Sequence, residues 1–162
     1  MSRLDSFIRR LEAQRTLLDW AADAIGDRGG HVLEVGLGNG RTFDHLREKF
    51  PGRRIFAFDR ANNAHPESVP PADHLLLGEF SETLPRFAGA HAGEAILIHA
   101  DAGLGEPAAN ARQVARLSEW LPPLAASGAL VLCDQNLSSP ELEPTPLPSG
   151  VPQGRYFVFT RR

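Results

Sequence analysis

The chain has 162 residues, of which 42% are hydrophobic, and a formal net charge of −3 at pH 7. This length suits one domain with a sizeable core, and the composition excludes a disordered, collagen-like or coiled-coil chain. The acidic balance argues against a nucleic-acid-binding domain that works by overall charge. Cys133 is the only cysteine, so an internal disulfide and a cysteine-rich zinc site are both excluded.

The first expected element is a long helix. Apolar residues from Leu4 to Ile25 recur at spacings of 4, 3, 7, 3 and 4 positions, which places them on one helical face. Gly29 and Gly30 then end the helix. The chain has no apolar run near the ~20 residues of a membrane helix and no secretory signal, so we expect a cytoplasmic protein without a membrane partner.

Short apolar strands then alternate with helices, which predicts a mostly parallel sheet covered on both faces. The expected strands are His31–Val35, Ile55–Phe58, His74–Leu77, Ala95–Ile98 and Ala129–Leu132. The expected helices are Arg41–Phe50, Ser81–Phe87 with Ser81 as its cap, and Glu106–Leu124.

Two stretches break the alternation. Ala61–Asp73 carries three prolines where a helix would be expected, which predicts a loop near the site. Five prolines fall between Pro140 and Pro152, and the strand that follows has no helix after it, which predicts an antiparallel return to the sheet. We therefore expect a single domain over residues 1–162, with an N-terminal helix (1–28), a cofactor-binding core (31–135) and a proline-rich loop with a final strand (136–162).

A glycine-rich loop, Gly36-x-Gly38-x-Gly40, lies between the first strand and the next helix. Its glycines allow close backbone approach, and the helix N-terminus adds a partial positive charge. Asp59 follows the next strand, where a carboxylate can accept hydrogen bonds from both hydroxyls of a ribose. The loop alone would be a weak signal, but with this acid and the strand–helix alternation it predicts a nucleotide-type cofactor.

Two cofactor classes remain open at this level. A dinucleotide fingerprint needs G-x-G-x-x-G, but here Arg41 stands where the last glycine belongs and would obstruct helix–strand packing. A nicotinamide-dependent oxidoreductase is therefore disfavoured. The pattern Glu34-x-Gly36-x-Gly38-x-Gly40 instead resembles motif I of the class I S-adenosylmethionine (SAM) methyltransferases.

The resemblance covers roughly residues 32–160 and implies a three-layer, Rossmann-like α/β fold. It implies the strand order 3-2-1-4-5-7-6, with Tyr156–Thr160 as the antiparallel strand 7 and Glu141–Pro146 as strand 6. It also implies SAM as cofactor and S-adenosylhomocysteine as product. The run from His99 to Gly103 and the short chain are similar to a family of small bacterial methyltransferases whose substrate is unassigned.

The resemblance also assigns site residues. Glu79 matches the position that approaches the adenine amino group, and Asp101 matches the one that faces the methyl group. The expected cofactor-binding residues are Glu34, Gly36, Leu37, Gly38, Gly40, Arg41, Asp59, Arg60, Glu79, Phe80 and Asp101.

The expected catalytic residues are Asp101 and His99. Both lie at the end of the fourth strand, and alternation along a strand predicts that they point to the same side. A lysine base is not expected, because the only lysine, Lys49, lies on the helix after the glycine loop.

A metal-dependent alternative is open as well. Asp101, Asp134 and Asn136 resemble the oxygen ligands of the Mg²⁺-dependent catechol-type O-methyltransferases. Two departures weaken this reading: Gln135 separates the second aspartate from the asparagine, and Leu104 stands where that family has a lysine.

The sequence does not identify the acceptor. Without an appended substrate domain, a small molecule is expected, held by the first helix and the loops Ala61–Asp73 and Ser138–Gln153. Arginines on the first helix could attract an anionic acceptor, or that helix could form a homodimer interface. A non-catalytic SAM-binding sensor or subunit is the remaining alternative.

Overall fold

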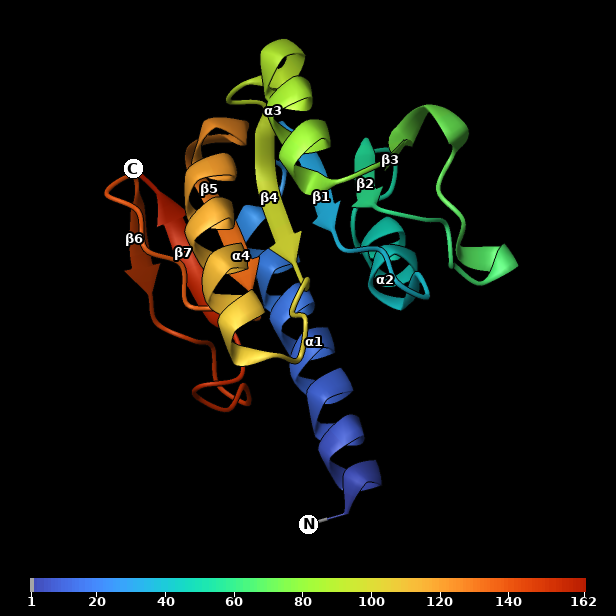
Figure 1. Ribbon diagram of the computed structural model, residues 1–162, viewed down its shortest axis with the longest axis vertical. Coiled ribbons are helices and arrows are strands. Elements are labelled where there is room, and N and C mark those ends of the chain that lie inside the picture. Colours follow the sequence, from blue (N-terminus) through green and yellow to red (C-terminus); the bar gives the residue numbers. More distant parts are fainter. Residues whose placement is uncertain (1) are drawn as a thin grey trace.

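The computed structural model describes residues 2–162 and contains one mixed sheet between two helical layers (Figure 1). Its strands are β1 (His31–Val35), β2 (Ile55–Asp59), β3 (Leu75–Leu77), β4 (Ala95–Ala100), β5 (Ala125–Cys133), β6 (Leu142–Thr145) and β7 (Phe157–Arg161). Its α-helices are α1 (Arg3–Ile25), α2 (Arg41–Lys49), α3 (Phe80–His91) and α4 (Pro107–Trp120).

The sheet has the order β3-β2-β1-β4-β5-β7-β6. The pairs from β3 to β5 are parallel, whereas β7 runs antiparallel to both β5 and β6. This order and the antiparallel last strand confirm the fold that the resemblance implied. Because the parallel strands end at one edge of the sheet, the residues that follow β1, β2, β3 and β4 meet there.

The core is divided between the two faces of the sheet. Successive strand residues point to opposite faces, so Val32 packs with α1 and α2, while Leu33 and Val35 pack with α3 and α4. The same division holds in β5, where Leu132 and Val131 enter different clusters. Both faces are therefore covered, as continuous apolar strands require.

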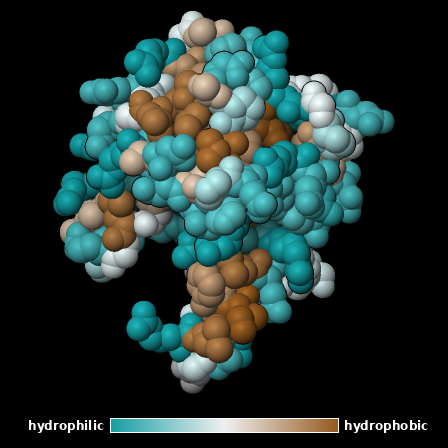
Figure 2. Space-filling view, turned by 90° about the vertical axis from the view of Figure 1, so that its right-hand side faces the viewer, coloured by the Kyte–Doolittle hydropathy of each residue, from teal (hydrophilic) through white to brown (hydrophobic). Residues whose placement is uncertain are grey.

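Helix α1 lies only partly on the sheet. Ser2 and Asp5 form a capping box that satisfies backbone N–H groups at its start. One face of its second half is buried, whereas Leu4, Phe7 and Ile8 in its first half are exposed. Figure 2 shows this apolar first half projecting below the body of the molecule. Among residues 2–162, no helix is long and apolar enough to cross a membrane.

Several element boundaries differ from those predicted. Helix α3 is longer than expected at both ends, and its N-cap is Glu79 rather than Ser81. His74 belongs to a short 3-10 turn before β3 instead of to the strand. Helix α4 ends at Trp120, because Pro122 and the residues after it form a separate 3-10 turn.

Strand β5 begins four residues earlier than expected. Gly128 has a φ of +77°, and a glycine in this conformation is more typical of a turn than of a strand. The strand nevertheless passes through it, because the pairing with β4 shifts register between the Ala95–Ala125 and Leu97–Leu130 partners. An irregularity of this kind accommodates a glycine inside a strand.

Candidate active site

The glycine loop after β1 adopts a backbone that requires glycine at two positions. Gly36 has a φ of +95°, and a Cβ there would collide with the carbonyl oxygen of Asp101. Gly40 has a φ of +86°, and a Cβ there would lie 2.8 Å from the Cβ of Ser68. A Cβ on Gly38 would meet no protein atom within 4 Å, so the middle of the loop borders open space.

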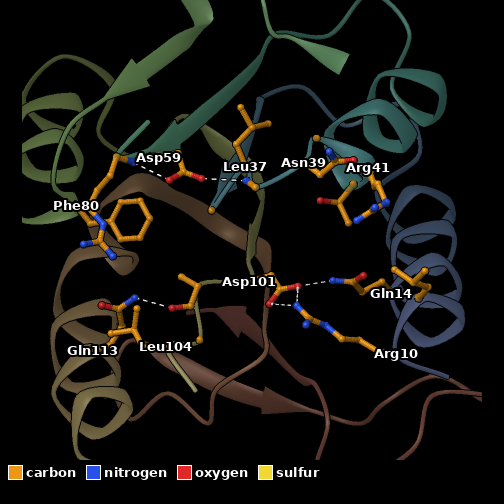
Figure 3. Close-up of a pocket in the computed structure, with 18 of the residues that line it drawn as sticks. Arg10, Gln14, Leu37, Asn39, Arg41, Asp59, Phe80, Asp101, Leu104 and Gln113 are labelled. Carbon is orange, nitrogen blue, oxygen red and sulfur yellow. Dashed lines mark hydrogen bonds and ion pairs between the residues drawn. The ribbon is translucent and has the colours of Figure 1, made fainter. Parts of the chain in front are cut away.

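This open space is a cavity of about 480 Å³ at the carboxyl edge of the sheet (Figure 3). The glycine loop, the ends of β2 and β4, the start of α3, and helices α1 and α4 form its wall. Of the predicted cofactor-binding residues, the wall contains Gly36, Leu37, Gly38, Gly40, Arg41, Asp59, Arg60, Glu79, Phe80 and Asp101. The structure thus brings together every residue of that set except Glu34.

Glu34 and His99 lie side by side beneath the glycine loop and outside the cavity wall. Both side chains are fully buried, and Nδ1 of His99 is 2.8 Å from Oε2 of Glu34. The other oxygen of Glu34 accepts a hydrogen bond from the Thr42 hydroxyl on α2. Glu34 therefore connects β1, β4 and α2 directly below the loop that these elements position.

The charge of Glu34 controls the protonation of His99. Burial acts to lower the pKa of His99, but the charge and hydrogen bond of Glu34, together with Asp101 and Asp134, outweigh burial and raise that pKa. Nε2 of His99 is buried and has no hydrogen-bond partner in residues 2–162. His99 and Asp101 both lie on the α1 side of the sheet, because His99 alternates with Leu97, which packs with α1, and Asp101 bonds to Arg10 and Gln14 of that helix.

Asp59 lies on the wall at the end of β2. Its Oδ2 accepts from the backbone N–H of Gly38 at 2.9 Å, and its Oδ1 accepts from the N–H of Arg60 at 2.7 Å. Each carboxylate oxygen keeps further lone pairs for a ligand. Glu79 stands nearby, with an oxygen 3.9 Å from the Arg60 guanidinium. This end of the cavity therefore presents acceptors for hydroxyl and amino donors.

Asp101 faces the opposite end of the cavity, where it meets helix α1. One guanidinium nitrogen of Arg10 lies 2.7 and 2.9 Å from its two oxygens, and Gln14 donates a further hydrogen bond. The hydrogen bond that Arg10 donates to Asp101 raises the pKa of Arg10. Tyr156 lies beside this pair, and burial, followed by the Asp101 charge, raises the pKa of its hydroxyl. The projecting helix is thereby fixed to the end of β4.

The hydrogen bonds of Asp134 and the exposure of Asn136 do not favour a metal site. Asp134 accepts from the N–H groups of Ala102 and Gly103, at 3.4 and 3.0 Å. Burial, and then the Asp101 charge, raises the pKa of Asp134, so Asp134 holds its charge less readily than an ordinary carboxyl. Asn136 is exposed, and neither it nor Asp134 lines the cavity.

Some wall residues have little signal in the sequence. Phe7 and Gln14 come from α1, and Gln113 and Arg116 come from α4. Gln14 has a weak signal in the sequence, because it is a polar residue within the seven-position gap of the apolar stripe on the first helix. Gln113 donates to the carbonyl oxygen of Ala102 at 2.7 Å, a contact that only the folded chain reveals.

The loops expected to hold an acceptor lie elsewhere. Residues 61–73 form two 3-10 turns and pack behind the glycine loop, where His65 donates its N–H to the carbonyl of Asn39 at 3.0 Å. Neither this segment nor residues 138–153 contribute to the cavity wall. Only the first helix does so among the three segments expected.

Comparisons with known proteins agree with this geometry. The model of an S-adenosyl-L-methionine methyltransferase family matches residues 1–162. An S-adenosyl-L-methionine methyl transferase from Silicibacter pomeroyi DSS-3 is 41% identical, with a TM-score of 0.93, over 100% of this chain and 99% of that one. The comparison with curated proteins found no match.

More distant solved structures share the fold. A Burkholderia thailandensis 1,6-didemethyltoxoflavin-N1-methyltransferase, solved with that compound and S-adenosylhomocysteine, is 18% identical with a TM-score of 0.56, over 93% of this chain and 77% of its own. Cofactor-bound Rv0187 from MTB is 21% identical with a TM-score of 0.62, over 92% and 79% of the two chains.

Proposed function

The chain belongs to the S-adenosyl-L-methionine methyltransferase family, and from this premise we propose that it methylates a small, anionic molecule in the cavity at the carboxyl edge of its sheet. One observation carries the proposal: the glycine loop, Asp59 and Asp101 line a single cavity of about 480 Å³. That volume falls within the ~300–1,000 Å³ of small-molecule sites.

The two ends of the cavity suit the two ends of SAM. We assign the ribose to Asp59, whose carboxylate can accept from both hydroxyls, and the adenine to the side of Phe80 and Glu79. The amino-acid tail of SAM carries an ammonium and a carboxylate, and Asp101 and Arg10 offer the complementary charges at the opposite side (Figure 3). The open space at Gly38 supports this fit.

Two arginines at the cavity support an anionic acceptor. Arg41 and Arg116 line the wall, and within residues 2–162 neither has an acidic partner at 4.0 Å or less. The Arg41 guanidinium lies 6.0 Å from the centre of the Phe7 ring, and the exposed Leu104 lines the same cavity. An acceptor with an apolar body and a negative group would match this combination.

When bound, SAM supplies an electrophilic methyl group, so much of the protein's contribution is to hold and orient the reactants. Asp101 is the ionisable residue after β4 that reaches the cavity, and we propose that it positions the amino-acid tail next to the reacting centre. His99 lies outside the wall, so we give it a positioning role through Glu34 and the loop. The metal-dependent alternative gains no support from the bonds of Asp134.

The cofactor assignment is tested by substituting Asp59. Asp59→Ala should weaken binding of S-adenosylhomocysteine at least tenfold, since hydrogen bonds to a charged group contribute about 1.5–3 kcal/mol. Isothermal titration calorimetry measures this change. Asp73→Ala is the matched control, because Asp73 is an exposed aspartate outside the cavity wall. Equal affinities in both variants would contradict the role of Asp59.

The acceptor class is tested with labelled SAM and fractionated cell extract. The proposal predicts that the methyl label appears in molecules that pass a dialysis membrane, and that Arg41→Gln reduces the labelling through a raised KM for the acceptor. Label confined to retained protein or nucleic acid would contradict the small-molecule acceptor. It would leave the cofactor assignment intact.

A further inference from the structure

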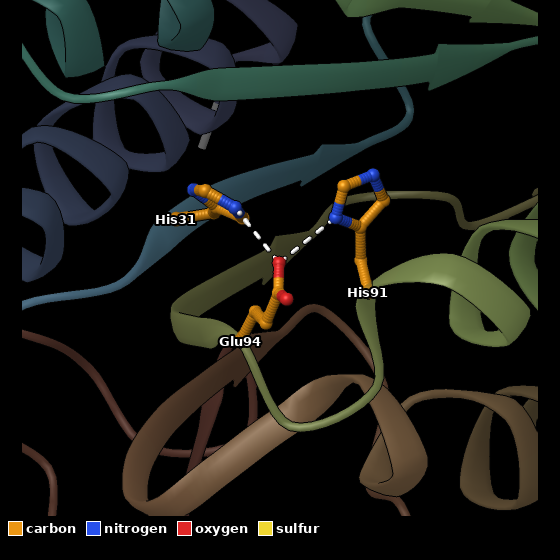
Figure 4. Close-up of side chains that lie close together, drawn as sticks. All are labelled: His31, His91 and Glu94. Carbon is orange, nitrogen blue, oxygen red and sulfur yellow. Dashed lines mark hydrogen bonds and ion pairs between the residues drawn. The ribbon is translucent and has the colours of Figure 1, made fainter.

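A second group of chemically active side chains lies at the other edge of the sheet. His31 begins β1, His91 ends α3, and Glu94 lies in the connection that leads into β4. Figure 4 shows both imidazole rings turned toward the carboxylate of Glu94. These residues stand at the amino ends of parallel strands, whereas the cavity stands at the carboxyl ends. The group therefore has no part in the site described above.

The three side chains converge on one point. Nε2 of His31 lies 3.0 Å from Oε2 of Glu94, and Nδ1 of His91 lies 2.8 Å from the same oxygen. Their ligand atoms all fall within 4.8 Å of one another. Two nitrogens and one carboxylate oxygen around a common centre form a typical donor set for a divalent transition metal.

The backbone holds these side chains in place. The N–H of His31 donates to the carbonyl oxygen of Glu94 at 2.8 Å, and the N–H of Glu94 donates to that of His91 at 3.3 Å. Gly93 forms the turn with a φ of +68° and donates to the carbonyl of Pro123 at 2.9 Å. Three segments that are distant in sequence thus fix the group before any ligand binds.

Aromatic packing fixes the ring orientations as well. The ring of Phe56 lies 5.3 Å from that of His31 and 5.7 Å from that of His91, between centres. Phe87 stacks on His91 at 4.4 Å. Rings held on both sides in this way lose little further freedom when they bind a ligand.

We propose that His31, His91 and Glu94 bind one zinc ion, with water as the fourth ligand. Zinc–nitrogen and zinc–oxygen bonds of about 2.0–2.2 Å in a tetrahedron place the ligand atoms about 3.3–3.6 Å apart. The observed separations to the Glu94 oxygen, 3.0 and 2.8 Å, therefore need to widen by about 0.3–0.8 Å. Two histidines and one carboxylate, with one open position, suit zinc better than Mg²⁺ or Ca²⁺, because those two ions prefer oxygen ligands.

Zinc at this point would bridge α3 to the amino edge of the sheet. Helix α3 starts at the cavity with Phe80 and ends at this group with His91. An ion that binds only the folded chain stabilises that chain in proportion to the logarithm of its concentration over the dissociation constant. The bound ion would therefore raise the melting temperature without contacting SAM.

The test combines a spectroscopic and a thermodynamic measurement on the full chain, freed of metal by dialysis. Co²⁺, which takes the same ligands, should give the visible spectrum of a tetrahedral cobalt centre, and Zn²⁺ should abolish it. Calorimetry should find one zinc ion per chain. Glu94→Gln and His91→Ala should weaken zinc binding about tenfold or more, because each removes a ligand.

His65→Ala is the matched control, because His65 is exposed and belongs to the loop behind the glycine loop. That variant should bind zinc like the unsubstituted protein, and all variants should keep their affinity for S-adenosylhomocysteine. Equal zinc affinity in Glu94→Gln, His91→Ala and the unsubstituted protein would overturn the proposal. Octahedral cobalt or no zinc uptake in the unsubstituted protein would overturn it too, whether or not the variants fold.

Discussion

Glu34 and His99 form a fully buried pair of ionisable side chains beneath the glycine loop. Both side chains are fully buried, and removing one partner leaves the other desolvated and unpaired. Such a pair is a weak source of net stability, yet it is costly to break. Its connection through Thr42 to the helix after the glycine loop gives it a positioning role for the cofactor-binding backbone.

The raised pKa of His99 predicts how stability depends on pH. Since the folded chain holds this proton more tightly than the unfolded chain, the contribution to the free energy of unfolding is fully present below about pH 6.5, the unfolded pKa. It is lost as the pH rises through the folded pKa. Glu34→Gln removes the charge that raises this pKa. The free energy of unfolding of the unsubstituted protein should therefore exceed that of the variant most at low pH.

Urea unfolding of the two proteins from pH 6 upward measures this difference. We expect a difference in the free energy of unfolding that shrinks as the pH rises. A difference that is constant over the range, or that grows with pH, would mean that the pair does not titrate as described.

The sequence indicates which candidate site residues lie together only where the signal is local. The alternation of Gly36, Gly38 and Gly40 and the position of Asp59 follow from a strand–loop–helix pattern, and the structure brings all four residues to one cavity. The contacts of Asp101 needed the fold, because its partners lie on α1, ninety-one residues away for Arg10. No spacing in the sequence encodes a contact between such distant segments.

At the scale of elements, α1 consists of two different halves. Its apolar stripe continues along the whole helix, so the sequence predicted one amphipathic element without distinguishing the halves. In the structure, Leu17, Leu18 and Ala21 are buried on the sheet, whereas Leu4 is 66% exposed. Periodicity reports which face is apolar, but the length of the sheet decides how much of that face is covered.

Two leucines of this helix give a direct comparison. Leu18→Ala should destabilise the protein by about 2–5 kcal/mol, because it opens a cavity among well-packed neighbours. Leu4→Ala should change the free energy of unfolding by no more than about 0.5 kcal/mol, as expected for an exposed position. Chemical denaturation of both variants measures this, and equal losses would show that the projecting half is covered in solution.

For the whole molecule, the sheet order was predictable, because parallel strands and an antiparallel return follow from the alternation and the resemblance. The position of α1 beside the cavity was harder to predict from the sequence, because it depends on the contacts of Arg10 and Gln14 with Asp101. The metal-binding group at the opposite edge was not predicted at all. His91 and Glu94 lie three residues apart in the sequence, but His31 joins them only through the register of β1 with β4.

Binding of SAM in the cavity at the carboxyl edge is best measured by calorimetric titration with S-adenosylhomocysteine, with NAD as the control. We expect one site per chain for S-adenosylhomocysteine and none for NAD. We also expect about 2.7 kcal/mol of added stability when the ligand is at 100 times its Kd. Absence of S-adenosylhomocysteine binding, or binding of NAD in its place, would rule out this cavity as a SAM site.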